Sequence, residues 1–111
     1  MSASAISPVG GHPDGIYLLY ALGDEGMDYE RLQAVVEKVP YFPLGSACWL
    51  VKLQGSEVLN FSNEASYALP EAESKAELLL FYLAPHSAIV HGNADGLGLK
   101  NWLRKHGNWL L

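Results

Sequence analysis

The sequence predicts a single α+β domain of ferredoxin-like topology, with an antiparallel sheet and helices on one of its faces. Apolar runs of strand length alternate with segments of helical periodicity in the order β-α-β-β-α-β-β, and a short terminal helix follows. Two β-α-β halves of this kind pair into one antiparallel sheet. The length of 111 residues suits one domain, and half of the residues are apolar while 17% are charged, which is typical of a packed domain.

The first half of the domain begins after an N-terminal arm. Residues 1–15 are rich in Ser, Ala, Gly and Pro, which predicts a flexible arm, and the domain then covers residues 16–111. Residues 16–22 form a continuous apolar run, which predicts a central strand covered on both faces. Asp28 is a suitable N-cap for a helix over residues 29–39. The apolar stripe of that helix is formed by Leu32, Val35, Val36 and Val39, and Pro40 ends it.

Two strands and an ambiguous segment follow. Strands are predicted over residues 41–44 and 48–53, and Pro43 indicates that the first lies at a sheet edge or is very short. Residues 56–69 permit either a helix or a hairpin. The helix is favoured because the β-α-β-β-α-β topology then closes.

The last third of the chain carries the remaining elements. Residues 77–83 predict a second strand with two apolar faces, and residues 88–91 predict a short strand. A final helix covers residues 99–106, and Gly107 is the expected C′ residue. The expected core joins strand residues to one helix face: Leu18, Leu50, Leu79 and Phe81 packed against Leu32, Val36 and Val39.

The charge distribution, the cysteine content and the hydropathy pattern limit the expected ligands and cellular location. The net charge is −5, of which residues 97–111 contribute +3 and residues 1–96 contribute −8, so strong nucleic-acid binding is not expected. The single cysteine, Cys48, lies in an apolar run, which predicts a buried and inert thiol. The chain has no apolar run of about 20 residues and no basic start, which predicts a cytoplasmic protein without membrane contact.

Five short segments carry a resemblance to a known family: residues 16–20, 27–32, 43–52, 88–92 and 101–106. They resemble SinR-like small proteins, which are related to the small CRISPR adaptation nuclease and to toxin ribonucleases. The resemblance implies a ferredoxin-like fold. It also implies which position of this chain corresponds to the metal-binding residue of the nuclease relatives.

That site is altered in this chain. In the nuclease relatives, the metal-binding aspartate ends the first strand in a Tyr-Asp-Leu pattern, whereas this sequence has Tyr20-Ala21-Leu22. Alanine has no ligand atom, so the resemblance implies a member without the catalytic aspartate. Asp24 and Glu25 are weak candidates for a replacement, since acidic residues are also ordinary in an exposed turn.

No cofactor or metal site is predicted. His12, His86, His91 and His106 have no cysteine or carboxylate partners at zinc-site spacing. The glycine-rich residues 92–100 lack the Gly-Lys-Ser/Thr ending of a phosphate loop.

The C-terminal segment carries the remaining candidates. Lys100, Arg104 and Lys105 form a cationic group that either contacts nucleic acid weakly or complements the helix dipole. The apolar ending either forms a protein interface or folds back onto its own sheet. The interface candidates are Trp102, Trp109, Leu110 and Leu111.

Together these patterns predict a non-catalytic protein–protein interaction module that forms a homodimer or binds another protein. The resemblance suggests a phage-defence, anti-defence or toxin–antitoxin setting. The alternatives are a divalent-metal-dependent ribonuclease that uses Asp24 or Glu25 and a weak nucleic-acid-binding module.

Overall fold

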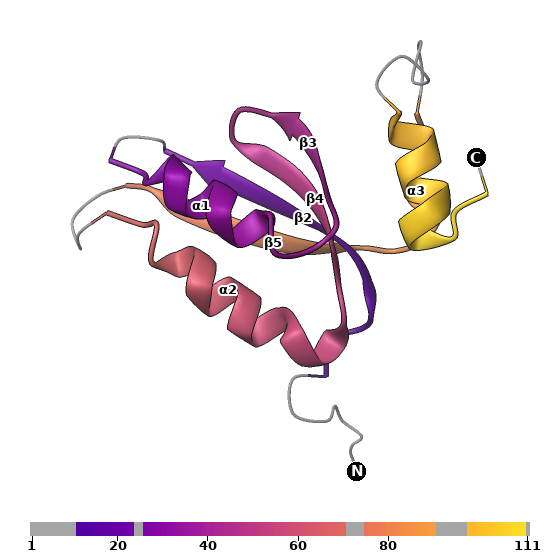
Figure 1. The fold of residues 1–111 in the computed structure, drawn as a ribbon, viewed down its shortest axis with the longest axis horizontal. Helices are drawn as coiled ribbons and strands as arrows, with labels where there is room; N and C mark the ends of the chain where they lie inside the picture. The colour runs from indigo at the N-terminus through magenta and orange to yellow at the C-terminus, as the bar shows by residue number, and fades with distance from the viewer. Residues whose placement is uncertain (1–10, 24–25, 71–74, 91–97, 111) are drawn as a thin grey trace.

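The computed structural model describes residues 11–23, 26–70, 75–90 and 98–110 (Figure 1). In these ranges it is an α+β structure with one sheet and helices on both sides of it. The elements are β2 (Gly15–Leu22), α1 (Tyr29–Val36), β3 (Tyr41–Gly45), β4 (Cys48–Leu53), the 3-10 turn η1 (Gly55–Glu57), α2 (Val58–Ser66), β5 (Glu77–Leu83) and α3 (Leu99–Gly107).

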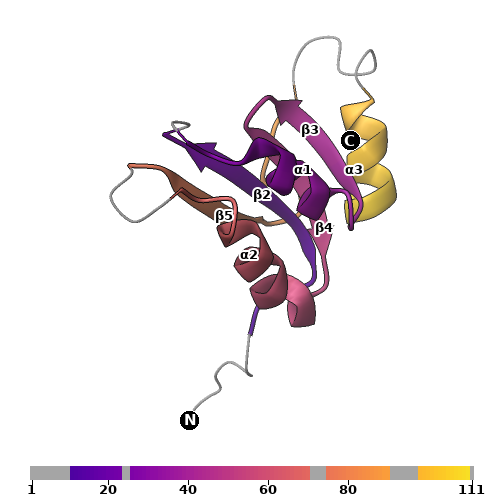
Figure 2. The same ribbon diagram turned by 60° about the vertical axis from the view of Figure 1, so that its left-hand side comes forward.

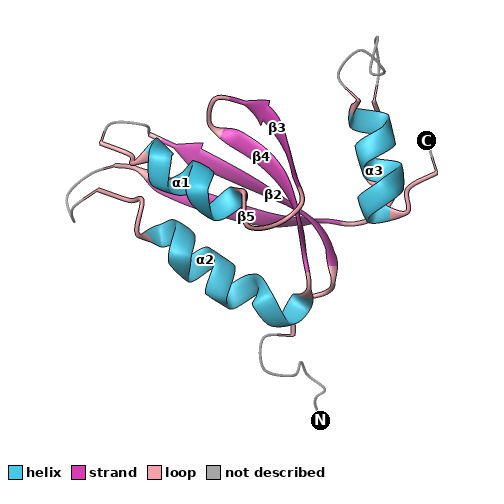
Figure 3. Ribbon diagram, viewed as in Figure 1, coloured by secondary structure: helices cyan, strands magenta, loops and turns pink. Residues whose placement is uncertain are grey.

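The sheet has four antiparallel strands in the order β3-β4-β2-β5 (Figure 3). β2 lies inside the sheet and pairs along its length with β4 and β5. Among the described strands, β3 and β5 therefore lie at the two edges of the sheet. Pro43 lies in β3, as its sequence position predicted for a short edge strand, and the pairing of β3 with β4 is irregular between Pro43 and Gly45.

α1 and α2 cover one side of the sheet, which we call the first face. Alternate residues of the strands point to this face, among them Leu19 and Val51, and they pack against Leu32, Val36 and Phe61 of the helices. Leu32, Val36 and Val51 are fully buried. Each such side chain stabilises the fold by about 1.5–3 kcal/mol relative to exposure, so this layer is the main core.

α3 lies on the opposite side, which we call the second face (Figure 2). It packs near the start of β2, where Ile16, Leu50, Leu103 and Trp109 form a second core. Two helices cover the first face, whereas α3 is the one described helix on the second face and covers only part of it.

Most of the predicted elements are confirmed. β4 and β5 have the predicted bounds, and the segment 56–69 is helical and not a hairpin, although α2 covers only Val58–Ser66 after the 3-10 turn η1. The helix begins through a reciprocal cap, in which the Glu57 carboxylate accepts a hydrogen bond from the Gln54 backbone amide at 2.9 Å. Asp28 caps α1 as expected, accepting from the Arg31 amide at 3.1 Å.

Four predictions about the elements need correction. α1 ends at Val36, three residues early, because Lys38 and Val39 bond to carbonyls three residues back in a tight turn before Pro40. Residues 88–90 form no strand, and position 91 lies outside the described residues. Gly107 belongs to α3, and Asn108 adopts the left-handed conformation instead, with φ of 58°.

The fourth correction concerns the core. Leu18, Leu50, Leu79 and Phe81 do share one sheet, but they point to the second face, away from Leu32 and α1. Phe81 is 50% exposed. β5 was predicted to be covered on both faces, whereas it is an edge strand whose second face is partly open.

The end of the predicted arm is tied to the domain. The Asp14 carboxylate accepts a hydrogen bond from the Gly55 amide at 2.6 Å, and the Tyr17 hydroxyl donates to the Pro13 carbonyl at 2.7 Å. The backbone crosses Gly55 so closely that a side chain there would collide with the His12 carbonyl oxygen. Residues 11–14 therefore pack against the domain, and β2 starts one residue before the predicted boundary.

Candidate functional site

The second face of the sheet has three rows of side chains that run across the strands. The row near the start of β2 and most of the middle row lie near α3, whereas the third row lies toward the other end of the strands. From the β2 start outward, the rows are Lys52, Ile16 and Leu83; then Phe42, Leu50, Leu18 and Phe81; then Cys48, Tyr20 and Leu79.

The uncovered part of this face is apolar. We call Tyr20, Leu44, Cys48, Leu79 and Phe81 the open patch. Tyr20 is 40% exposed, Leu44 44% and Phe81 50%, so three large apolar side chains stand in solvent on one sheet face. An exposed apolar group of this kind typically marks an interaction surface.

An apolar cavity of 370 Å³ joins the open patch to α3. Its described lining has no charged side chain: Leu18, Leu44, Leu50 and Leu83 come from the sheet, Ala88, Ile89 and Val90 follow β5, and Leu99 and Leu103 come from α3. Ile89 is 83% exposed at its rim. The cavity therefore extends the apolar character of the open patch toward the helix.

The C-terminal segment folds back onto this face. Trp109 is 2% exposed, its amide donates to the Leu103 carbonyl at 3.3 Å, and its ring lies 6.1 Å from that of His86. The next amide, of Leu110, donates to His86 Nδ1 at 3.4 Å. Of the two alternatives for the apolar ending, fold-back is the one that Trp109 adopts, whereas the side chain of Leu110 stays exposed.

Gly107 makes this fold-back possible. A Cβ atom at this position would lie 2.8 Å from Trp109 Cδ1 and 3.0 Å from Ile16 Cγ1. The first contact is closer than a Cβ atom tolerates, and the second would require the Ile16 side chain to shift. Without a side chain at this position, α3 can approach β2 and the Trp109 indole can lie against the end of the helix. Glycine is therefore needed at position 107 for close packing and not for a left-handed backbone, which Asn108 adopts instead.

The other interface candidates have different positions. Trp102 is half-buried between Phe42 and His106, with ring centroids 6.1 and 5.0 Å away. Leu110 is 87% exposed. Position 111 lies outside the described residues.

The cationic candidates lie on α3. Arg104 and Lys105 are exposed in its last turn, and Arg104 Nη1 donates to Asn101 Oδ1 at 3.0 Å. Lys100 is partly buried one turn before Arg104. The last-turn position of Arg104 and Lys105 stabilises the helix dipole, whereas Lys100 in the first turn does not, and the exposed Arg104 and Lys105 also leave a small cationic surface.

The weak catalytic candidates, positions 24 and 25, lie outside the described residues. Ala21, which replaces the expected metal-binding aspartate, is 4% exposed, and its side chain belongs to the core of the first face. Among the described residues, no group of three or more His, Cys, Asp or Glu side chains could hold a metal ion.

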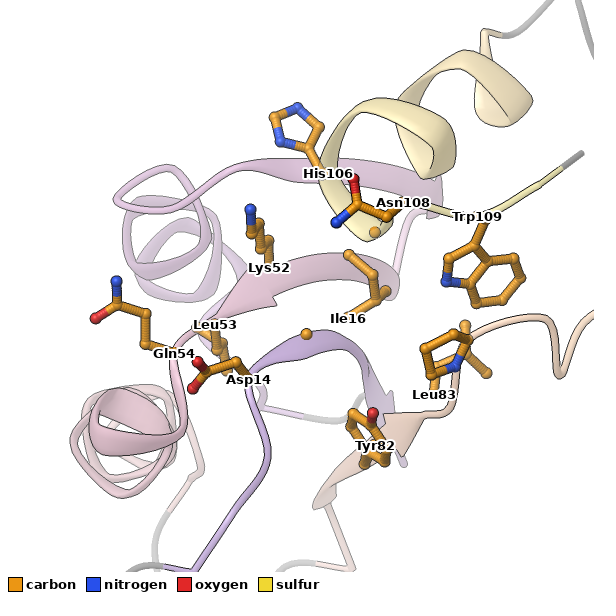
Figure 4. A pocket seen from close by; sticks show the side chains of 13 residues that line it. Asp14, Ile16, Lys52, Leu53, Gln54, Tyr82, Leu83, His106, Asn108 and Trp109 are labelled. Carbon is orange, nitrogen blue, oxygen red and sulfur yellow. The ribbon is translucent and has the colours of Figure 1, made fainter.

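A polar pocket of 510 Å³ lies between the start of β2, the end of β4 and the end of α3 (Figure 4). Its polar side chains include Lys52, Gln54, Tyr82, His106 and Asn108. The volume is in the range of about 300–1,000 Å³ typical of small-molecule sites. The described lining also contains Asp14, and it contains neither cysteine nor serine.

His106 in this pocket has a perturbed pKa. Burial, and then the positive charges of Lys105 and Lys52, lower its pKa from the ordinary value of 6.5. On the second face, partial burial raises the pKa of the Cys48 thiol above 9.0, which favours its protonated form. The side chain is half-buried, whereas the sequence predicted a buried thiol.

We expect protonation of His106 to weaken the fold. The unfolded chain binds a proton near pH 6.5, whereas the folded chain binds it only at lower pH. Between these two pKa values the unfolded state holds more protons, so the free energy of unfolding falls as the pH drops below about 6.5 and levels off below the folded pKa. Denaturant unfolding of the parent and of His106→Gln, at about pH 7.5 and about pH 5, measures this contribution. A loss of stability equal in the two proteins would contradict it.

In comparisons with protein-family models, with curated proteins and with solved structures, no match was found. The structure also contains, within its described residues, no helix long and apolar enough to cross a membrane.

Sequence reasoning missed the open patch. Residues 16–22 and 77–83 were predicted as strands with two apolar faces. A run of apolar residues has the same sequence pattern whether both faces of the strand are covered or one face is open at a sheet edge. The absence of charge from Leu78 to Leu83 was visible in the sequence. Only the strand order shows that this run lies at an edge.

Proposed function

We propose that this chain is a non-catalytic protein–protein interaction module that associates with a second copy of itself. The observation that carries the proposal is the open patch, in which Tyr20, Leu44 and Phe81 expose between 40% and 50% of their surface on one sheet face. Burying large side chains of this type stabilises an association by removing apolar surface from water.

Charge also favours a second copy. The cationic end of α3 carries Arg104 and Lys105, whereas residues 1–96 have a net charge of −8. Two copies can place the cationic helix of one near the acidic remainder of the other, which offsets part of the repulsion between two chains of net charge −5.

We also propose that the fold is ferredoxin-like and that the chain is a SinR-like protein without nuclease activity. The strand order β3-β4-β2-β5, with α1 and α2 on the first face, supports the ferredoxin-like arrangement. The buried position of Ala21 supports the absence of metal-dependent cleavage, because a metal ion there would be shielded from substrate. A phage-defence, anti-defence or toxin–antitoxin setting follows from this resemblance alone.

We expect the substitution Phe81→Lys to weaken self-association by about tenfold or more, because each dimer would lose two apolar contacts and gain two charges. Multi-angle light scattering over a concentration series should show the parent at twice the 12.1 kDa chain mass and the variant shifted toward one chain mass. The matched control is Leu59→Lys on α2, since Leu59 is 49% exposed and Phe81 is 50% exposed.

The control variant should keep the parent's mass. A parent that stays at one chain mass at every concentration would contradict the proposal. Cleavage of labelled RNA with magnesium or manganese in the same samples would favour the ribonuclease alternative instead. Salt-sensitive RNA binding that is lost in Arg104→Ala would favour the nucleic-acid-binding alternative.

A further inference from the structure

We infer that β5 is the contact strand of the dimer and pairs in antiparallel fashion with β5 of a second copy. The inference rests on the proposed function and specifies its geometry. β5 is an edge strand of seven residues, Glu77–Leu83, and pairs on one side with β2. Alternate residues of an edge strand direct their amide and carbonyl groups away from the sheet, where another strand can bind them.

This edge lacks the features that normally prevent pairing. Folded proteins protect an edge strand with proline, lysine, a bulge, a charged side chain or short length. From Leu78 to Leu83, β5 has no proline, glycine or charged residue. The opposite edge, β3, is five residues long, contains Pro43 and has an irregular register between Pro43 and Gly45. We therefore expect β3 to resist pairing with a further strand and β5 to allow it.

The side-chain pattern selects the register. Residues opposite each other in an antiparallel pair point to the same face of the sheet. In a symmetric pair, one residue of β5 therefore lies opposite the same residue of the second copy, with the two-fold axis midway between them. With the axis at Leu80, the whole of β5 pairs with itself. Leu79 then lies opposite Phe81 of the second copy, and Leu78 lies opposite Tyr82 of the second copy.

This register places apolar side chains opposite one another on both faces. On the first face, Tyr82 is 40% exposed beside Tyr17, with ring centroids 5.4 Å apart. On the second face, Phe81 gains Leu79 of the second copy as a neighbour. Aromatic and branched apolar pairs of this kind are favourable across antiparallel strands.

Charge is compatible with the same register. Glu77 is the only charged residue of β5. The axis at Leu80 places it opposite Leu83 of the second copy, at the end of the strand, so the two Glu77 carboxylates lie at opposite ends of the paired strands. No like charges face each other.

The pairing brings only the β5 part of the open patch, Leu79 and Phe81, to the contact, whereas Tyr20 on β2 and Leu44 on β3 stay on the open face. Tyr20, Leu79 and Phe81 lie next to one another from β2 to β5 on the second face. Two four-stranded sheets joined at β5 form one sheet of eight strands, in which the two open patches become continuous across the two-fold axis. The exposed ring of Phe81 would then lie near the centre of the interface.

A disulfide test reads the register directly. In a Cys48→Ser background, Leu80→Cys places two thiols opposite each other, with Cα atoms about 4.5–5.5 Å apart. This separation is inside the range of about 4.4–6.8 Å that a disulfide spans. The matched variant Tyr82→Cys places its thiols four residues out of register, about 14 Å apart along the strands. We expect Leu80→Cys to form a covalent dimer under mild oxidation and Tyr82→Cys to remain uncrosslinked.

A second pair covers the case in which Leu80→Cys does not fold. Leu79→Cys and Phe81→Cys, also in the Cys48→Ser background, should form a mixed disulfide when combined, and each should crosslink poorly alone. A parent that is dimeric by light scattering while none of these variants crosslinks would overturn the β5 pairing and leave the proposed function standing. A parent that is monomeric by light scattering would overturn both. Equal crosslinking of Leu80→Cys and Tyr82→Cys would reject the register.

Discussion

We expect Trp109→Ala to release the C-terminal segment from the sheet and to lower the free energy of unfolding by about 3–5 kcal/mol. The side chain is 2% exposed and forms the second core with Ile16, Leu50 and Leu103. Its removal leaves a large cavity against the start of β2. The remaining ties of this segment, a 3.3 Å bond to the Leu103 carbonyl and a 3.4 Å bond to His86, are at the long end of hydrogen-bond geometry and cannot compensate.

Amide hydrogen exchange together with denaturant unfolding measures this effect. Exchange should accelerate most in α3, because the helix has its buried contacts in the second core, whereas β4 amides should respond less. Leu110→Ala is the matched control in the same segment, since Leu110 is 87% exposed. If both variants unfold at the parent's denaturant concentration, Trp109 does not stabilise α3 in the way that the structure indicates.

The second large effect is expected from Leu32→Ala, which should lower the free energy of unfolding by about 2–5 kcal/mol and destabilise the whole domain. Leu32 is fully buried in the main core between α1 and the first face. Its loss weakens the packing of α1 on the sheet. Because this core joins helices and strands from most of the described chain, we expect a cooperative loss and not a local opening.

The control for this substitution is Leu59→Ala, which removes the same atoms from a side chain that is 49% exposed on α2. Thermal and denaturant unfolding should place Leu59→Ala close to the parent and Leu32→Ala well below it. A similar loss in both variants would mean that the main core does not depend on the α1 stripe.

These two variants address different layers. The main core contains Leu32, Val36 and Val51, whereas the second core is small and holds one nine-residue helix. A helix of this length is marginal by itself, so its stability depends on contacts with the sheet. The C-terminal segment is therefore the part most readily separated from the fold.

The sequence by itself determined the local elements, because each depends on neighbouring residues. Asp28 supplied the cap of α1, and an apolar run without glycine or proline defined β5. Pro43 indicated that β3 is an edge strand or very short, since a missing amide is tolerated at an edge, and the strand lies at an edge. The helix over residues 56–69 could be selected over a hairpin because only the helix closed the topology.

The candidate site depends on relations that no local pattern contains. An apolar residue on each side of a strand has the same sequence pattern whether or not a layer covers it, so Phe81 was assigned to the core although it is half exposed. Likewise, an apolar ending such as Trp109 and Leu110 is compatible with an interface or with fold-back, and the choice depends on whether Gly107 allows the approach to Ile16. Which strands lie at the edge, and which faces receive a helix, follow from how segments distant in sequence pack together. Only the tertiary structure therefore decided that the open patch and the free edge of β5 lie side by side.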